Sequence, residues 1–155
     1  MGLSPARKET LERTEAEATS LTEVLYQEKS LTADINNPSL AAISDLTFNN
    51  LTVGQKYRAM GALTGGSEAS PSSGDHHLVV DVTHDSAILQ RLRVRGNAIT
   101  DIFSTIPILA VFTATASTLT FVVSTSTNAR ILGTPKTTFV ILEKLPNHTA
   151  TTIWT

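Results

Sequence analysis

The sequence predicts a mainly β protein with an N-terminal α-helix, in which the β part is a sandwich of jelly-roll type. Two observations lead to this prediction. Mostly apolar residues recur at alternating spacings of three and four over the first 35 residues, as they do along a coiled-coil seam, although Thr14 and Glu28 interrupt the pattern. After residue 45 the pattern changes to short apolar and β-branched runs separated by turn residues. We therefore expect a coiled-coil stalk over residues 1–38, a hinge over 39–45 and a knob over 46–155.

Composition limits the classes of function. The 155 residues are 41% hydrophobic, which is ordinary for a globular protein, and the formal net charge is −2. This charge and the lack of a basic run suggest neither a nucleic-acid partner nor an anionic membrane surface. Without cysteine the chain has no disulfide, cysteine zinc site or thiol nucleophile. We see neither a run of roughly 18 apolar residues that would span a bilayer nor the apolar core of a secretory signal.

The predicted helix begins at Ser4 and Pro5, a typical cap and first turn, and ends before Pro38. A stripe this narrow buries too little surface for a lone helix, so it predicts association with other copies of the chain. The alternative is an amphipathic helix that packs on its own β domain. The seam of the predicted stalk is formed by Leu11, Thr14, Ala18, Leu21, Leu25, Glu28 and Ile35.

The knob is predicted to consist of short strands. They are expected at residues 46–50, 56–63, 77–83, 87–94, 98–103, 108–115, 118–124, 138–145 and 151–154. Turn residues separate them, among them Gly65-Gly66, Gly96-Asn97 and Gly133-Thr134-Pro135. Near-continuous apolar runs after residue 111 suit strands that are buried on both faces, in a sandwich or at a subunit contact.

The four histidines are the first candidates for a metal site. His76 and His77 follow Asp75, but adjacent side chains of a strand point to opposite faces, and His84 and His148 lie far away in sequence. We therefore expect no metal site. No nucleophile elbow, phosphate-binding loop or dinucleotide fingerprint occurs either, so we expect neither enzymatic activity nor a cofactor.

Three arginines alternate along one predicted strand. Arg91, Arg93 and Arg95 place their guanidinium groups on one face. One interpretation is a solvated surface. The other is an anion site between subunits, in which these arginines meet Glu143 of a neighbouring copy or a small anionic ligand.

Residues 46–58 (LTFNNLTVGQKYR), 138–146 (TFVILEKLP) and 151–154 (TTIW) follow the glutamate-rich heptad segment. With this arrangement the chain resembles the distal part of the tail needle of short-tailed enterobacterial bacteriophages. The resemblance implies a homotrimer at the tail tip of the virion, with a trimeric coiled coil before a tumour-necrosis-factor-like or C1q-like jelly-roll knob. The implied partners are the phage tail assembly and the host outer membrane or a surface receptor, which the knob contacts or penetrates during genome ejection. Candidates for the knob core or the contact between subunits are Phe112, Phe121, Val123, Phe139 and Trp154.

Two other functions fit the same pattern. A receptor-binding or carbohydrate-binding tail-fibre tip would use exposed aromatic side chains for stacking, and aromatic residues make up only 5% of the chain. A secreted trimeric ligand of the tumour-necrosis-factor or C1q kind would be made with a signal or membrane anchor, and we recognise neither in this sequence.

Overall fold

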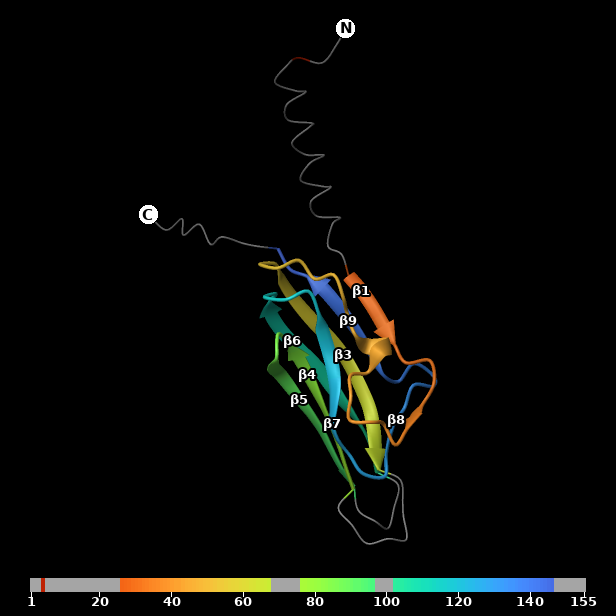
Figure 1. The fold of residues 1–155 in the computed structure, drawn as a ribbon. Coiled ribbons are helices and arrows are strands. Elements are labelled where there is room, and N and C mark those ends of the chain that lie inside the picture. Colours follow the sequence, from red (N-terminus) through yellow and green to blue (C-terminus); the bar gives the residue numbers. More distant parts are fainter. Residues whose placement is uncertain (1–3, 5–25, 68–75, 97–101, 147–155) are drawn as a thin grey trace, which may run out of the picture.

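The computed structural model describes Ser4 and residues 26–67, 76–96 and 102–146. Within these ranges the chain forms strands, one short 3-10 turn named η1 (Ser44–Leu46), and no α-helix. The strands are β1 (Tyr26–Ser30), β2 (Ile35–Asn36), β3 (Lys56–Ser67), β4 (His76–His84), β5 (Ala87–Gly96), β6 (Ile102–Thr113), β7 (Leu119–Ser126), β8 (Ala129–Ile131) and β9 (Phe139–Lys144). The prediction of a mainly β sandwich is therefore confirmed (Figure 1).

The larger sheet, sheet A, is organised around β3. Its strand order is β1-β9-β3-β8-β2, with β6 on the other side of β3. β3 pairs antiparallel with β6 along its whole length, from Lys56 opposite Thr113 to Ser67 opposite Ile102. Its other edge is shared, because β9 pairs with the first half of β3 and β8 with its last three residues.

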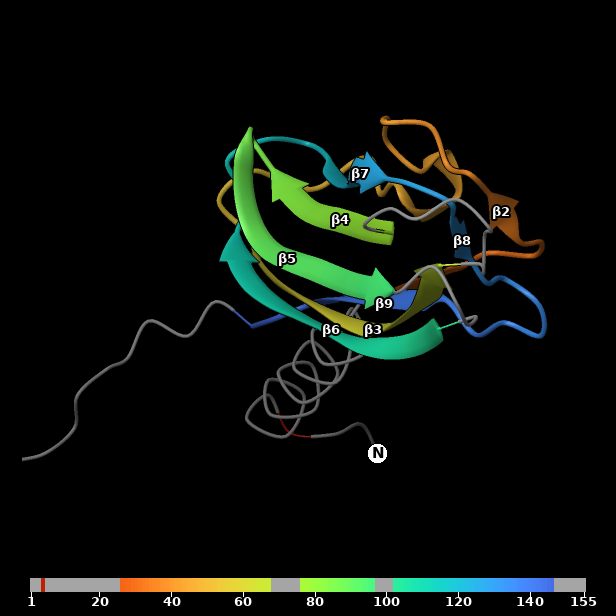
Figure 2. The same ribbon diagram turned by 90° about the horizontal axis from the view of Figure 1, so that it is seen from below.

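The smaller sheet, sheet B, has the order β5-β4-β7. Asp85 and Ser86 join β4 to β5 with φ angles of 48° and 65°, as a type I′ hairpin requires. Residues 41–48 run alongside β7 and form isolated bridges to it at Ala42 and Phe48. Figure 2 shows β4 and β5 as a layer over β3, β6 and β9.

The core lies between the two sheets and is formed by alternate residues of each strand. On β4, for example, Leu78, Val80 and Val82 are buried. The other strands contribute Tyr57, Ala59, Leu63, Leu92, Val94, Ile108, Ala110, Phe112, Leu119, Phe121, Val123, Ala129, Ile131, Val140 and Leu142. Because alternate residues point inward, the remaining residues of the same strands form two outer faces.

The helix predicted up to residue 35 is wrong for its last part. Tyr26–Ser30 form β1 and pair with β9, and Ile35–Asn36 form β2 and pair with β8. Between them Leu31 enters the core and is only 1% exposed. β1 is an edge strand held by backbone pairing, so its exposed side chains show no alternation that the sequence could reveal. Residues 5–25, with the rest of the predicted stalk, lie outside the described residues.

The structure also corrects two predicted strand boundaries. β3 continues through Gly65-Gly66, where a turn was predicted, and β6 continues through residues 104–107, which were predicted to separate two strands. Pro107 lies within β6, where its carbonyl points away from β3 and accepts a hydrogen bond from Gln90 at 3.1 Å. Its missing N–H therefore costs no bond to β3. Gly65 and Gly66 lie inside β3, and a Cβ on Gly65 would meet the Leu78 side chain at 2.5 Å. Close packing of the sheets, and not a turn, explains this glycine.

β1 begins and the chain leaves β9 at the same end of the sandwich (Figure 1). We call this the terminal end. Backbone hydrogen bonds from Gly54 to Ala114 and from Ala114 to Gln55 join two loops there. The far end is where β4 begins and β5 finishes.

Candidate functional site

The outer face of sheet A is apolar across several strands. Met60 of β3 lies opposite Leu109 of β6 on one side and opposite Ile141 of β9 on the other. Leu109 is 62% exposed and Val111 is 52% exposed. We call this surface the apolar face; its apolar residues are Tyr26, Met60, Ala62, Pro107, Leu109, Val111, Phe139 and Ile141, and the charged residues Glu28, Arg58 and Glu143 share it. Apolar residues gathered on one exposed face indicate an interaction surface.

One ion pair lies on the apolar face. Arg58 donates to Glu143 Oε2 through Nε at 2.9 Å and also through Nη2. The two residues are directly opposite on β3 and β9, and their side chains are 39% and 25% exposed. The pair is therefore compensated within the chain while it still contacts solvent.

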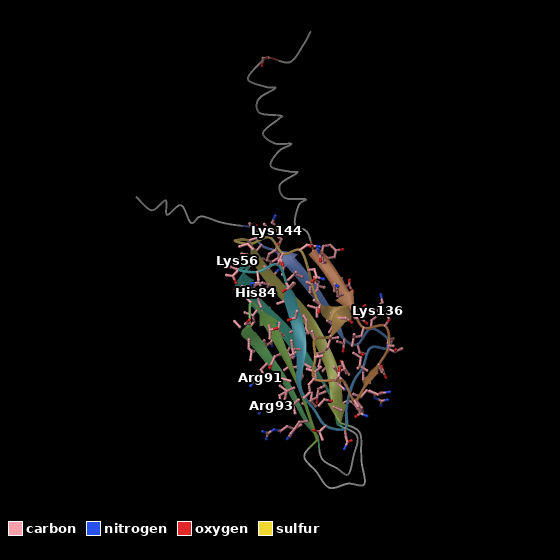
Figure 3. The ribbon with its side chains drawn as sticks, viewed as in Figure 1. Lys56, His84, Arg91, Arg93, Lys136 and Lys144 are labelled. Atoms are coloured by element: carbon pink, nitrogen blue, oxygen red, sulfur yellow. The ribbon has the colours of Figure 1, made fainter. Side chains whose placement is uncertain are left out.

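The outer face of sheet B is polar and carries the predicted arginines. Arg91, Arg93 and Arg95 are exposed on β5 and alternate with buried Leu92 and Val94. We call this surface the arginine face; it consists of His77, Val79, Asp81, Thr83, Arg91, Arg93, Arg95, Thr120, Val122 and Ser124. Figure 3 shows Arg91 and Arg93 on β5, well away from Lys144 and the terminal end.

A buried acid holds the first of these arginines. Arg91 donates to Asp81 through Nε at 2.7 Å and through Nη2 at 3.0 Å, which is a bidentate pair. Asp81 is only 5% exposed, yet the hydrogen bonds from Arg91 lower its pKa below the usual value. The same pairing raises the pKa of Arg91. Arg91 is thus neutralised inside the chain.

The predicted anion site does not form one cluster within the chain. Glu143 binds Arg58 on the apolar face, and the β5 arginines lie on the opposite outer face. Sequence analysis missed Asp81 as the partner of Arg91. The signal was an acid at an outward position between two core valines, Val80 and Val82, in a strand that otherwise reads as buried.

The predicted core and contact residues are divided between two locations. Phe112, Phe121 and Val123 are 7%, 0% and 2% exposed inside the sandwich of a single protomer. Phe112, Phe121 and Val123 therefore lie in the knob core, which is one of the two roles predicted for them. Phe139 is half-buried on the apolar face, and Trp154 lies outside the described residues.

The predicted stalk seam is only partly described. Glu28 lies on β1 with its side chain exposed, opposite Ile141 of β9. Ile35 lies on β2 and packs against the core. Neither belongs to a helical seam. The other five seam residues, Leu11, Thr14, Ala18, Leu21 and Leu25, lie outside the described residues.

His84 lies at the terminal end, where hydrogen bonds to two loop residues and a contact with an aromatic ring hold its side chain in place. Its Nδ1 lies 2.8 Å from the carbonyl oxygen of Thr118, and its Nε2 accepts the backbone N–H of Thr115 at 2.9 Å. Its ring lies against Phe112, with centroids 4.7 Å apart. In the described part of the chain, no group of three or more histidine and acidic side chains is close enough to hold a metal ion, and no helix is long and apolar enough to cross a membrane.

A pocket opens between β1, β9 and the loop that precedes β3. Its floor is apolar and is formed by Leu51, Leu142 and the ring of Tyr57, whose hydroxyl accepts the N–H of Thr52 at 3.0 Å. Its rim carries three carboxamides, a hydroxyl and an ammonium group, from Gln27, Asn49, Asn50, Thr52 and Lys144. We call it the amide pocket. Sequence analysis missed it because these residues come from three distant segments.

Comparisons with known proteins give only distant structural likenesses. No protein-family model and no curated protein matches the chain. The C-terminal domain of EclA, a sugar-binding protein, is similar with a TM-score of 0.36 and 16% identity over 79% of each chain. The CBM22-1–GH10 modules of xylanase Xyn10B from Clostridium thermocellum, solved with xylohexaose, give a TM-score of 0.33 and 15% identity over 79% of this chain and 26% of that chain. Neither likeness assigns a ligand to this protein.

Proposed function

We propose that this chain is the distal part of a trimeric phage tail needle, whose knob contacts or penetrates the host envelope. In this proposal the copies associate through a coiled coil before Tyr26 and through the apolar face. The exposed apolar face is the observation on which the proposal rests, because Leu109 and Val111 gain nothing from exposure to water and are suited to contact with another copy.

The position of β1 supports a second copy as the occupant of this face. Five members of the predicted heptad seam, from Leu11 to Leu25, precede Tyr26, where β1 starts. β1 is an edge strand of sheet A. Copies that are joined through the preceding segment would therefore have their A sheets nearest the common axis, whereas their B sheets would lie outside.

Strand order supports the jelly-roll assignment of the knob. β1, β9, β3 and β6 are neighbours in sheet A, and residues 41–48, β7, β4 and β5 are neighbours in the other layer. The chain passes between layers from β3 to β4, from β5 to β6 and again from β6 to β7. Two antiparallel layers of four with such crossings are typical of a jelly roll. β8 and β2 are an addition to the far half of β3.

Sedimentation equilibrium of the full chain tests the association. We expect a trimer at micromolar concentration, and Leu109→Lys should weaken its assembly at least tenfold because an ammonium group would be buried between copies. Leu40→Lys is the matched control, since Leu40 is 67% exposed but lies beside β7, off the apolar face. A monomeric wild-type chain, or equal effects of both substitutions, would contradict the proposal.

Contact with the host envelope has a separate test. Dye release from liposomes made of host outer-membrane lipids should occur if the knob penetrates, and binding without release should occur if it only contacts the surface. An absence of both binding and release with a well-formed trimer would leave self-association in place but remove the envelope role.

A second candidate function is carbohydrate binding, and the amide pocket favours it. Carboxamides donate and accept hydrogen bonds, as pairs of sugar hydroxyls require, and the apolar floor suits the C–H face of a pyranose ring. Gln27, Asn49 and Asn50 have no side-chain hydrogen bond to another described residue. A glycan array on the wild type and on Asn49→Ala tests this function, with Asn36→Ala, an exposed asparagine outside the pocket, as the control.

A further inference from the structure

We propose that the far half of the arginine face is a binding site for phosphate groups fixed on a surface, namely those of lipopolysaccharide. This inference rests on the proposed envelope contact and identifies the chemistry of that contact. It is carried by Arg93 and Arg95, not by Arg91, and it involves the opposite outer face from the one that binds other copies.

Arg93 and Arg95 are the cations of this face that form no hydrogen bond or ion pair with an acid among the described residues, although the charge of Arg93 also helps to lower the pKa of Asp81. Arg91 is held by two hydrogen bonds to Asp81. By contrast, neither Arg93 nor Arg95 has a hydrogen bond or an ion pair with another described residue. Their guanidinium groups are therefore available to an external anion. A planar guanidinium group can donate two parallel hydrogen bonds to two oxygens of one phosphate group.

The strand fixes the spacing of these charges. Arg93 and Arg95 are two positions apart on β5, so their Cα atoms are about 6.6–6.8 Å apart. Leu92 and Val94 anchor the same strand in the core, at 1% and 4% exposure. The result is a short row of cations on a rigid support, which binds fixed anions at a low entropy cost.

The shape and composition of the face select the kind of anion. Among its described residues none is phenylalanine, tyrosine or tryptophan, so it lacks the stacking platform of single-stranded nucleic-acid sites. A few anionic groups at a surface fit better than a strand of nucleic acid.

The location is consistent with an envelope contact. β5 runs from the terminal end toward the far end, so Arg93 and Arg95 follow Arg91 in the direction away from the chain termini (Figures 1 and 3). If a stalk precedes β1, this is the half of the knob that meets the host surface first.

Flotation of the full chain with phosphatidylcholine vesicles, with and without lipopolysaccharide, tests the inference. We expect salt-sensitive binding only to the vesicles with lipopolysaccharide. Arg93→Gln/Arg95→Gln should bind about 30-fold more weakly, since each basic residue near an anionic membrane contributes about fivefold. Lys56→Gln/Lys136→Gln is the matched control, because it removes the same charge from exposed positions away from β5 (Figure 3).

Three results would overturn the inference: equal losses for the two double variants, unchanged binding to dephosphorylated lipopolysaccharide, or tighter binding to single-stranded DNA. Sedimentation of the same samples separates this failure from that of the proposed function. A trimer that does not bind lipopolysaccharide refutes only the phosphate site, whereas a monomer that binds through Arg93 and Arg95 refutes only the trimeric needle.

Discussion

The two outer faces of the sandwich differ although the inner faces of their sheets are alike. Both sheets point aliphatic and aromatic residues into one core. Outside, sheet A continues with Met60, Leu109 and Ile141, whereas sheet B presents Arg93 and Arg95. Strands that are apolar on both faces are typical of sheets covered on both sides, and strands that alternate with charge are typical of sheets with one face in water. In the proposed trimer, this difference favours sheet A as the sheet that is covered by other copies.

Each face also carries one carboxylate–guanidinium pair, and burial distinguishes them. Asp81 is 5% exposed and binds Arg91 through both carboxylate oxygens, whereas Glu143 uses one oxygen and has a side chain that is 25% exposed. Buried pairs leave an uncompensated charge when they are broken, and exposed pairs are replaced by water. The pairs should therefore respond differently to the same type of substitution.

The largest expected effect tests the division between inside and outside. Phe121→Ala should lower the free energy of unfolding by about 3–5 kcal/mol, because Phe121 is fully buried between the sheets. Val122→Ala, on the neighbouring outward position, should cost below about 1 kcal/mol. Thermal unfolding at one fixed protein concentration measures both. Similar losses for the two variants would show that β7 is placed with the wrong face toward the core.

This division was largely predictable from the sequence. Leu78, Val80 and Val82 alternate clearly, and the buried side of β5 follows from its three arginines. Pro107 and Gly65 misled the prediction because each normally ends a strand, and only tertiary neighbours show why they do not.

Strand β1, the apolar face and the amide pocket could not be predicted from the sequence. Tyr26–Ser30 continue a heptad pattern and become a strand only because β9 offers a free edge, which is a long-range effect. The apolar face and the amide pocket combine residues that are distant in sequence, so no local pattern marks them. The alternating arginines of β5 are a local pattern, so the sequence reveals them. Asp81, the acid that binds Arg91, comes from the neighbouring strand β4 and could not be assigned in this way.

The second largest effect concerns the buried pair on the arginine face. Asp81→Asn should lower the free energy of unfolding at neutral pH by about 2 kcal/mol, because Arg91 loses a charged acceptor. The pKa of Asp81 is lower in the folded chain than its usual value of 3.8. Its stabilising contribution is therefore complete above about pH 4 and is lost as the pH falls through the lowered folded pKa.

Urea unfolding at pH 7 and at successively lower pH values measures this contribution. The difference between wild type and Asp81→Asn should shrink as the acid limb is approached. The variant should keep some acid sensitivity, because backbone N–H groups of Gly133 and Thr134 also lower the pKa of Asp34. A difference that does not change with pH would mean that the charge of Asp81 contributes nothing.

The smallest effect on the protomer tests which face is covered. Glu143→Gln should change the free energy of unfolding of the dissociated chain by below about 1 kcal/mol, since the Arg58–Glu143 pair is partly hydrated. In the Leu109→Lys background, where assembly is weakened, Glu143→Gln should therefore leave the free energy of unfolding almost unchanged. In the otherwise wild-type chain, however, the same substitution would leave Arg58 without its acid between copies, so assembly should weaken at least tenfold. A substitution that is silent in both backgrounds would place the pair in water at all times, and the apolar face would then lack the partner that its composition predicts.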